Sequence, residues 1–169
     1  MTTILWFGRD LRLSDNPALA AAVSRGQPLV PLFILDDEDA GNWAAGGASR
    51  WWLHGSLEAL GEALLRHGTQ LVLRRGKAEA IIDQIISQTG ATAVYWNRRY
   101  EPWAKARSER LKKQLSNRRL EVKSFNSALI CEPWKLTTKS GDPYRVYTPF
   151  WKALRSYGVD DSVGSGTDR

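Results

Sequence analysis

The sequence contains little cysteine or histidine and lacks any long apolar run. Its 169 residues include one cysteine, Cys131, and two histidines, His54 and His67. A single thiol forms no disulfide framework, and these three side chains do not have the spacing of a metal site, so we expect no bound metal. The N-terminus has no basic-then-apolar signal pattern, and no apolar segment is long enough to cross a bilayer. We therefore expect a cytoplasmic protein without membrane contact.

The sequence also lacks the motifs of several common enzyme classes. It contains neither GxGxxG nor GxxxxGK followed by Ser or Thr, which disfavours a dinucleotide fingerprint and a P-loop. The two histidines lie within or at the end of an expected helix and have no evident nucleophile partner, which argues against a Ser-His-Asp triad. We identify no catalytic residue in the chain.

Short apolar strands alternate with helical segments along the chain. The expected strands are Thr3–Gly8, Leu29–Leu35, Gln70–Leu73, Thr92–Trp96 and Glu121–Phe125. Most are continuous apolar runs, typical of strands that are buried on both faces. The expected helices follow a cap at Asp15 or Asn16, contain the stripe Leu53–Leu64, and span Ala78–Gln88 and Pro102–Ser116. This alternation predicts an α/β fold: a doubly wound, Rossmann-like, five-stranded parallel sheet in the order 3-2-1-4-5 with helices on both faces.

The predicted strand order places a topological switch between the first and fourth strands. Ligands of open α/β sheets bind there, at the carboxyl ends of the strands. The loops at that edge are Arg9–Asn16, Asp36–Ser49 and Asn97–Glu101. In the first loop, Asp10, Arg12 and Asp15 suit structural roles as loop ties and a helix cap. Arg9 follows the strand toward the cleft, so we expect it to face an anionic or carbonyl-rich heterocycle.

Positive charge is concentrated in one segment. The chain has a net charge of +6, and Asn97–Lys123 alone holds ten Lys or Arg against three Asp or Glu. The favoured interpretation is a solvated helix face. The alternative is a phosphate-facing surface, which would bind with strong salt dependence.

The chain contains eight tryptophans, and most of them suit a hydrophobic core. Trp6, Trp52 and Trp96 fall on expected strands or on a helix face, so we interpret them as large core side chains. Trp43 lies in a glycine-containing loop where there is no core to fill. We expect Trp43 to stack on a planar ring.

Three motifs resemble those of a known family: WFGRDLRLSDNPAL at Trp6–Leu19, VYWNRRYEP at Val94–Pro102 and GDPYRVYTPFWKA at Gly141–Ala153. From about Thr3 to Leu154 the chain resembles the N-terminal α/β domain of the DNA photolyase/cryptochrome family. It is more similar to bacterial members that repair cyclobutane pyrimidine dimers than to plant or animal receptors. The resemblance implies a light-harvesting antenna domain, which holds a folate, a deazaflavin or FMN and passes excitation energy to reduced FAD. In the family, FAD and damaged DNA bind to a helical domain that follows.

The resemblance also implies a set of antenna-pocket residues. Positions that line the pocket of deazaflavin-type members are matched here by Phe33, Asp36, Arg50 and Glu101. The loop after the fourth strand departs from that pattern, since Arg99 stands where those members often carry an acidic residue, and Trp103 and Ala104 replace the Asn-Glu of a folate-type pattern. The chromophore therefore stays undecided, although arginines suit an acidic ligand such as a glutamylated folate. The full set of cofactor-binding candidates is Arg9, Phe33, Asp36, Trp43, Arg50, Asn97, Arg99 and Glu101.

The resemblance further implies how the chain is organised. We expect residues 1–157 to form the antenna domain and 158–169 a disordered tail, with the FAD-binding helical domain absent. The chain alone is then catalytically silent, whereas the full-length family member is a deoxyribodipyrimidine photo-lyase. The expected partners are the FAD- and DNA-binding domain of the same protein and damaged DNA. In the chain alone, the apolar segment Asp142–Leu154 favours self-association. Two alternatives are a free-standing nucleotide-binding module of the same topology and a cryptochrome photoreceptor domain.

Overall fold

The computed structural model describes residues 1–158. Within these residues the chain divides into two compact units, Met1–Ser127 and a shorter unit that begins at Ala128. Apart from Gly158, the expected tail at 158–169 lies outside the described residues. Among the helices of the described part, none combines the length and the hydropathy that a membrane span requires.

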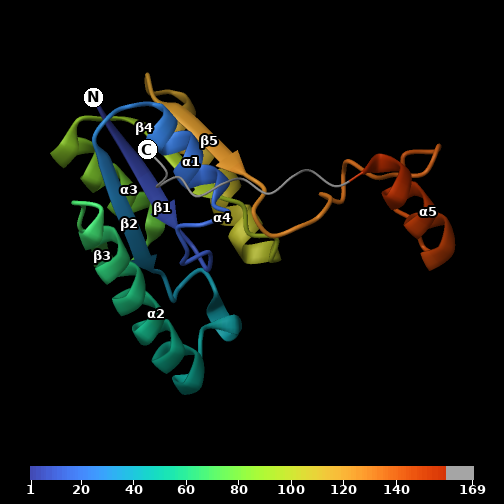
Figure 1. Cartoon of the computed structure of the whole chain (residues 1–169), viewed down its shortest axis with the longest axis horizontal. Helices are drawn as coiled ribbons and strands as arrows, with labels where there is room; N and C mark the ends of the chain where they lie inside the picture. Colours follow the sequence, from blue (N-terminus) through green and yellow to red (C-terminus); the bar gives the residue numbers. More distant parts are fainter. Residues whose placement is uncertain (159–169) are drawn as a thin grey trace. The chain divides into compact units, whose positions relative to one another are not determined.

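A five-stranded sheet forms the centre of the first unit (Figure 1). Its strands are β1 (Thr2–Phe7), β2 (Leu29–Leu35), β3 (Val72–Arg75), β4 (Ala91–Asn97) and β5 (Glu121–Phe125). All of its pairings are parallel, and the order β3-β2-β1-β4-β5 confirms the predicted doubly wound topology. The direction of winding reverses between β1 and β4, so the carboxyl ends of these two strands form the topological switch.

Helices pack on both faces of the sheet, as predicted. The helices of the first unit are α1 (Pro17–Ser24), α2 (Gly47–Arg66), α3 (Ala78–Thr89) and α4 (Pro102–Ser116), with a short 3-10 helix at Gly41–Trp43. The second unit contains α5 (Tyr147–Tyr157). Helices α3 and α4 contribute side chains to one core, and α1 and α2 contribute to another. Ile4 and Trp6 of β1 enter the first core, while Leu5 and Phe7 enter the second. The continuous apolar run of β1 follows from this arrangement, because alternate side chains of a strand point to opposite faces.

Turn chemistry after β1 sets the start of α1. Asn16 is the N-cap, since its side chain accepts a hydrogen bond from the Leu19 amide at 3.1 Å. Asp15, the other expected cap, instead has a positive φ of 46°. Its carbonyl accepts a hydrogen bond of 2.7 Å from the Arg12 guanidinium, which also donates to the carbonyl of Ser127 at 3.0 Å. The structural role of Arg12 is therefore confirmed, and the cap is Asn16 alone.

Two elements differ from the sequence-based expectation. Strand β3 runs over Val72–Arg75 rather than Gln70–Leu73, because its pairing with β2 begins at Val72 opposite Leu32. Helix α5 was not predicted. Its proline, Pro149, lies in the first turn of the helix, where a missing amide N–H costs no intrahelical hydrogen bond.

The tryptophans also divide differently from the expectation. Trp6 and Trp96 are buried core residues, as predicted, but Trp52 is 71% exposed, so its assignment to the core was wrong. The buried residues of α2 are Leu60 and Leu64, both in its C-terminal half. The N-terminal half of the helix extends beyond the end of β2 (Figure 1), where there is no sheet face to cover.

Candidate functional site

A cavity of about 770 Å³ lies at the carboxyl edge of the sheet. Its walls come from the ends of β1 and β2, from the loops after β1, β2 and β4, and from the N-terminal halves of α2 and α4. This is the switch-point edge at which open α/β sheets bind ligands, and the volume is in the range of small-molecule sites. The position of the cavity agrees with the cleft predicted from strand order.

The cavity brings together five of the eight candidate residues. Those that line it are Arg9, Phe33, Asp36, Trp43 and Arg99. Arg50, Asn97 and Glu101 do not line it, although each contacts a residue or a loop that does. The eight residues therefore separate into a group that faces the cavity and a group that supports it.

Two exposed tryptophans lie at the rim of the cavity. Trp43, in the 3-10 helix after β2, is 81% exposed, and Trp52 of α2 is the second. Both line the cavity and have large apolar faces open to a planar ligand. Sequence reasoning placed Trp52 in the core, but it lies in the N-terminal half of α2, where no residue is buried, and the helical spacing gave no signal of this.

The floor of the cavity contains a buried ion pair. Asp36 accepts hydrogen bonds from the amides of Asp39 at 3.3 Å and Ala78 at 3.1 Å. The Nη1 atom of Arg107 lies 3.6 Å from the carboxylate of Asp36, and both side chains are buried. Burial lowers the pKa of the Arg107 guanidinium, and the charge of Asp36 opposes that shift. The carboxylate oxygens of Asp36 are therefore already bonded to groups of the protein itself. Arg107 lines the cavity, although the sequence analysis did not identify it as a candidate.

Arg107 is held between two indole rings. Its guanidinium carbon lies 4.7 Å from the ring centroid of Trp6 and 5.2 Å from that of Trp103. Arg99 lies over the same Trp103 ring at 4.5 Å. Cation–π contacts of this kind offset part of the cost of burying the Arg107 charge.

Arg9, Arg99 and Glu101 form a second ion-pair group at the cavity wall. Arg99 donates to Glu101 at 2.7 Å and 3.3 Å, and Arg9 lies 3.3 Å from the same carboxylate. The Arg9 side chain is 72% exposed, whereas that of Arg99 is largely covered. Burial by itself raises the pKa of Glu101, but the hydrogen bond from Arg99 and the charges of both arginines hold that pKa below its ordinary value. Because Arg99 already neutralises Glu101, Arg9 is the cation with the most freedom to contact a ligand.

Arg50 has a supporting position outside the cavity. Its guanidinium makes two contacts of 3.1 Å with the carboxylate oxygens of Asp37. Its Nε atom donates to the carbonyl of Ala45 at 2.8 Å. These contacts join the end of β2 to the loop that carries Trp43, so Arg50 shapes the rim rather than the interior.

Asn97 is the buried residue that joins the two switch-point strands. Its Oδ1 atom accepts a hydrogen bond from the Ala18 amide at 3.1 Å, and its Nδ2 atom donates to Asp10 at 2.6 Å and to Asn16 at 2.7 Å. Asp10 also accepts from the Gly8 amide at 2.9 Å, which confirms its predicted structural role. The side-chain amide of Asn97 therefore makes its hydrogen bonds to other groups of the protein rather than to a ligand.

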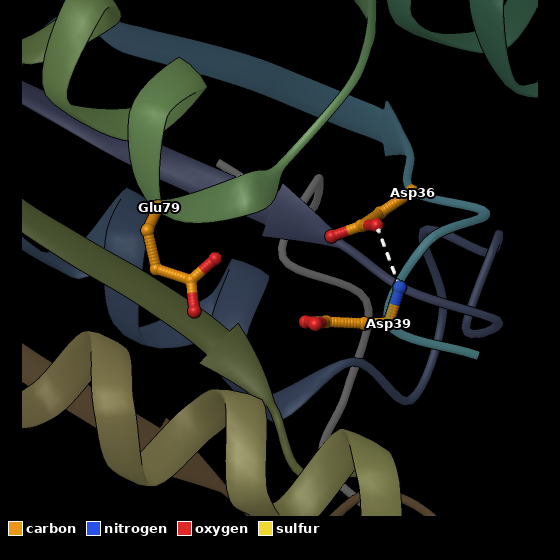
Figure 2. A group of neighbouring side chains, drawn as sticks. All are labelled: Asp36, Asp39 and Glu79. Atoms are coloured by element: carbon orange, nitrogen blue, oxygen red, sulfur yellow. Dashed lines mark hydrogen bonds between the residues drawn. The ribbon is translucent and has the colours of Figure 1, made fainter. Parts of the chain in front are cut away.

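Three carboxylates come together beside the cavity floor. Asp36, Asp39 and Glu79 place oxygen atoms within 4.8 Å of one another (Figure 2). Arg110 donates to Asp39 at 2.6 Å and to Glu79 at 2.9 Å, while Arg107 faces Asp36. The hydrogen bond to Glu79 raises the pKa of Arg110. Guanidinium groups thus supply the counter-charge of this cluster, which ties α4 to α3 and to the loop after β2.

Much of the basic segment Asn97–Lys123 is engaged in ion pairs within the first unit. Five of its cations contact carboxylates, in the pairs Arg99–Glu101, Arg107–Asp36, Arg110–Asp39, Arg118–Asp83 and Lys123–Glu121. A side chain that is held by an internal carboxylate is less available to a phosphate group. The structure therefore favours the interpretation as a helix face over that of a nucleic-acid surface.

These features define a class of protein: an open, doubly wound α/β domain with a ligand-sized cavity at its switch point. A family model described as DNA photolyase matches residues 3–162. The chain belongs to the DNA photolyase family.

Relatives and solved structures agree with this assignment. A deoxyribodipyrimidine photo-lyase of Agrobacterium fabrum is 53% identical over 89% of this chain and 31% of its own length. Cryptochrome-1 of Arabidopsis thaliana is 39% identical over 94% of this chain and 23% of its own length. A class III photolyase from Agrobacterium tumefaciens has a TM-score of 0.86 at 47% identity, over 98% of this chain and 34% of its own. An archaeal photolyase from Sulfolobus tokodaii, solved with two FAD molecules, has a TM-score of 0.72 at 27% identity, over 98% of this chain and 38% of its own. The chain thus spans between 23% and 38% of the length of these relatives.

The Asn97 network leads to a prediction about stability. Replacing Asn97 by Ala removes the side-chain acceptor of the Ala18 amide and one of the two donors to Asp10, so it should lower the free energy of unfolding by about 1–3 kcal/mol. Urea denaturation measures this change. Asn117→Ala, at the exposed end of α4, is the matched control and should change stability little. Equal effects of the two substitutions would contradict the assignment.

The ion pairs of Glu101 lead to a prediction about pH. Its folded-state pKa is depressed, so ionised Glu101 stabilises the fold above its ordinary pKa near 4.5, and this contribution is lost as the pH falls through the folded-state value. Glu101→Gln should lower the free energy of unfolding at neutral pH by about 0.2–1 kcal/mol, the range for partly exposed ion pairs. Denaturation at a series of pH values should show that wild type and Glu101→Gln reach the same free energy of unfolding in acid. A stability difference that does not change with pH would contradict the assigned role of ionised Glu101.

Proposed function

We propose that this chain is the light-harvesting antenna domain of a DNA photolyase. The observation that carries the proposal is the cavity at the switch point, lined by two exposed tryptophans and an exposed arginine, in a chain of this family. A planar chromophore needs an apolar slot for its ring and a few polar groups that orient it. The free-standing nucleotide-binding module is the weaker alternative, because the family match extends over nearly the whole described chain.

The wall chemistry favours a chromophore with an acidic group. Asp36 and Asp37 already have guanidinium partners, whereas Arg9 is mostly exposed and shares a carboxylate that Arg99 neutralises. Arg9 can therefore turn to a ligand without leaving a buried charge unpaired. A glutamylated folate and FMN both carry suitable anions on a planar heterocycle. A deazaflavin is the third candidate, for which the aromatic rim supplies most of the contact.

Each wall residue then has a proposed role. Trp43 and Trp52 stack on the ring of the chromophore, and Phe33 closes the apolar side of the slot. Arg9 binds the acidic group, while Arg99 and Glu101 hold Arg9 near the rim. Bound there, the chromophore absorbs light, and the excitation passes to a flavin on another part of the protein.

For the full-length protein we propose deoxyribodipyrimidine photo-lyase activity. The relative with 53% identity is a deoxyribodipyrimidine photo-lyase, and the cryptochrome relative is 39% identical, which favours repair over photoreception. Repair requires FAD and damaged DNA, for which we propose binding sites on a helical domain outside this chain. We therefore expect the 169-residue chain by itself to split no pyrimidine dimers.

The proposed site can be tested by titrating a folate, a deazaflavin and FMN against the purified chain. Arg9→Ala should weaken binding of an acidic chromophore by roughly 1.5–3 kcal/mol, about ten- to a hundredfold, because it removes a charge-assisted hydrogen bond. Trp52→Ala should cost about 0.5–1.5 kcal/mol through lost stacking. Changes in chromophore absorbance or fluorescence give the dissociation constants.

Two substitutions serve as controls for this titration. Trp51 neighbours Trp52 on α2 and is 74% exposed but does not line the cavity, and Arg119 lies at the far end of the basic segment. Trp51→Ala and Arg119→Ala should leave affinity almost unchanged. Absence of binding for all three chromophores, or equal losses in the control and test variants, would overturn the proposal.

Helix α5 supplies a candidate surface for the partner domain. Its apolar side chains recur at Tyr147, Phe150, Trp151 and Leu154, which is the spacing of one helix face. The Tyr147 and Trp151 rings stack with centroids 6.4 Å apart, and both side chains are substantially exposed. An apolar face of this kind marks an interaction site, and we propose that it packs against the FAD-binding domain of the same polypeptide.

This surface leads to a prediction about association of the isolated chain. With the apolar face of α5 uncovered, sedimentation velocity should show self-association at high protein concentration. Trp151→Glu should weaken the association, because it places a charge in the apolar face. Ser156→Glu adds the same charge to the polar side of α5 and should have little effect. A strictly monomeric wild-type chain would contradict the prediction.

A further inference from the structure

A second, much smaller cavity lies behind the floor of the first. Its volume is about 10 Å³, and its lining residues come from the ends of β1 and β4, from the loops that follow them, and from one turn of α4. Among the residues that line it are Trp96, Arg107 and Ser108. A cavity needs about this much room for the centre of a single water molecule.

Two of these residues carry buried N–H groups that lack an acceptor. The indole Nε1 of Trp96 and the guanidinium Nε of Arg107 are both buried and have no hydrogen-bond partner among the described residues. Buried donors without partners are rare in folded proteins, because such a group loses its bond to water without gaining another. It is therefore informative that both donors belong to residues that line the same small cavity.

The chemistry of the lining selects the occupant. An acceptor that serves both donors needs two lone pairs, and a water molecule can accept from both and donate to neighbouring oxygens. Ser108 lines the same cavity, and its hydroxyl group offers such an oxygen. The charge of Arg107 already faces Asp36 at 3.6 Å, so the site does not require an anion. A neutral, water-sized guest meets every requirement.

We propose that one structural water molecule binds here and bridges Trp96 Nε1, Arg107 Nε and the Ser108 hydroxyl. The water links β4 to α4 and fixes the plane of the Arg107 guanidinium between the Trp6 and Trp103 rings. It thereby sets the position of the cation that contacts Asp36 at the floor of the larger cavity. The inference concerns this internal site and stands whether or not the larger cavity binds a chromophore.

A crystal structure of the chain at about 1.5 Å resolution, where ordered water is well defined, tests the site directly. The expected result is one ordered water within about 3.2 Å of both nitrogens. Electron density without a water at this position, or direct hydrogen bonds from the two nitrogens to protein acceptors, would overturn the proposal.

Solution NMR supplies a second test with a matched pair of variants. The Trp96 indole N–H signal, assigned by its loss in Trp96→Phe, should show a nuclear Overhauser effect to a long-lived water. Ser108→Ala keeps the room for water and should retain the signal, whereas Ser108→Val fills the cavity and should lose it. An effect that persists in Ser108→Val, or that is absent from the wild type, would overturn the proposal. If Ser108→Val does not fold, the wild-type crystal structure decides.

Discussion

The buried side-chain amide of Asn97 is the contact on which the switch-point edge depends. It links the end of β4 to the loop after β1 and accepts from the Ala18 amide in the first turn of α1. The same amide donates to Asp10 and to the helix cap Asn16, so the loop after β1 has one conformation at this point. Because the loop carries Arg9, the amide also fixes where the exposed arginine leaves the sheet. A rigid edge of this kind is what a preformed ligand cavity requires.

The residues at the switch-point edge of the sheet divide into two groups. Asp10, Arg12, Asp36 and Asn97 spend their hydrogen-bonding capacity on the backbone and on one another. Arg9, Trp43 and Trp52 keep most of their surface open and line the same cavity. The first group holds the walls in place, and the second is free to contact a ligand. This division explains how a loop rich in charges can be mostly structural and still contribute to a binding site.

Features that depend on local chemistry could be predicted from the sequence. The strand at the apolar run of β1 was anticipated, and the cap of α1 was narrowed to Asp15 or Asn16, of which the structure has Asn16. Asn97 bonds to Ala18, 79 residues away in the chain, and Arg107 faces Asp36 in the loop after β2. The burial of these two residues therefore could not be inferred from the segments that carry them. Trp52 was misplaced because helical periodicity gives the direction of a side chain but not the point at which the helix passes the sheet. Helix α5 had a usable signal in the spacing of Tyr147, Phe150, Trp151 and Leu154, since a proline in the first turn does not exclude a helix.

The central claim is that the switch-point cavity of this chain is the chromophore site, and a crystal structure of the chain with a bound chromophore tests it most directly. The account predicts the ring in the cavity against Trp43 and Trp52, with an acidic group, where the ligand has one, at hydrogen-bond distance from Arg9. It also predicts that Asp36 and Arg107 keep their contact in the complex. A chromophore bound elsewhere, such as on the basic face of α4, with the cavity closed by its own tryptophans, would contradict the claim.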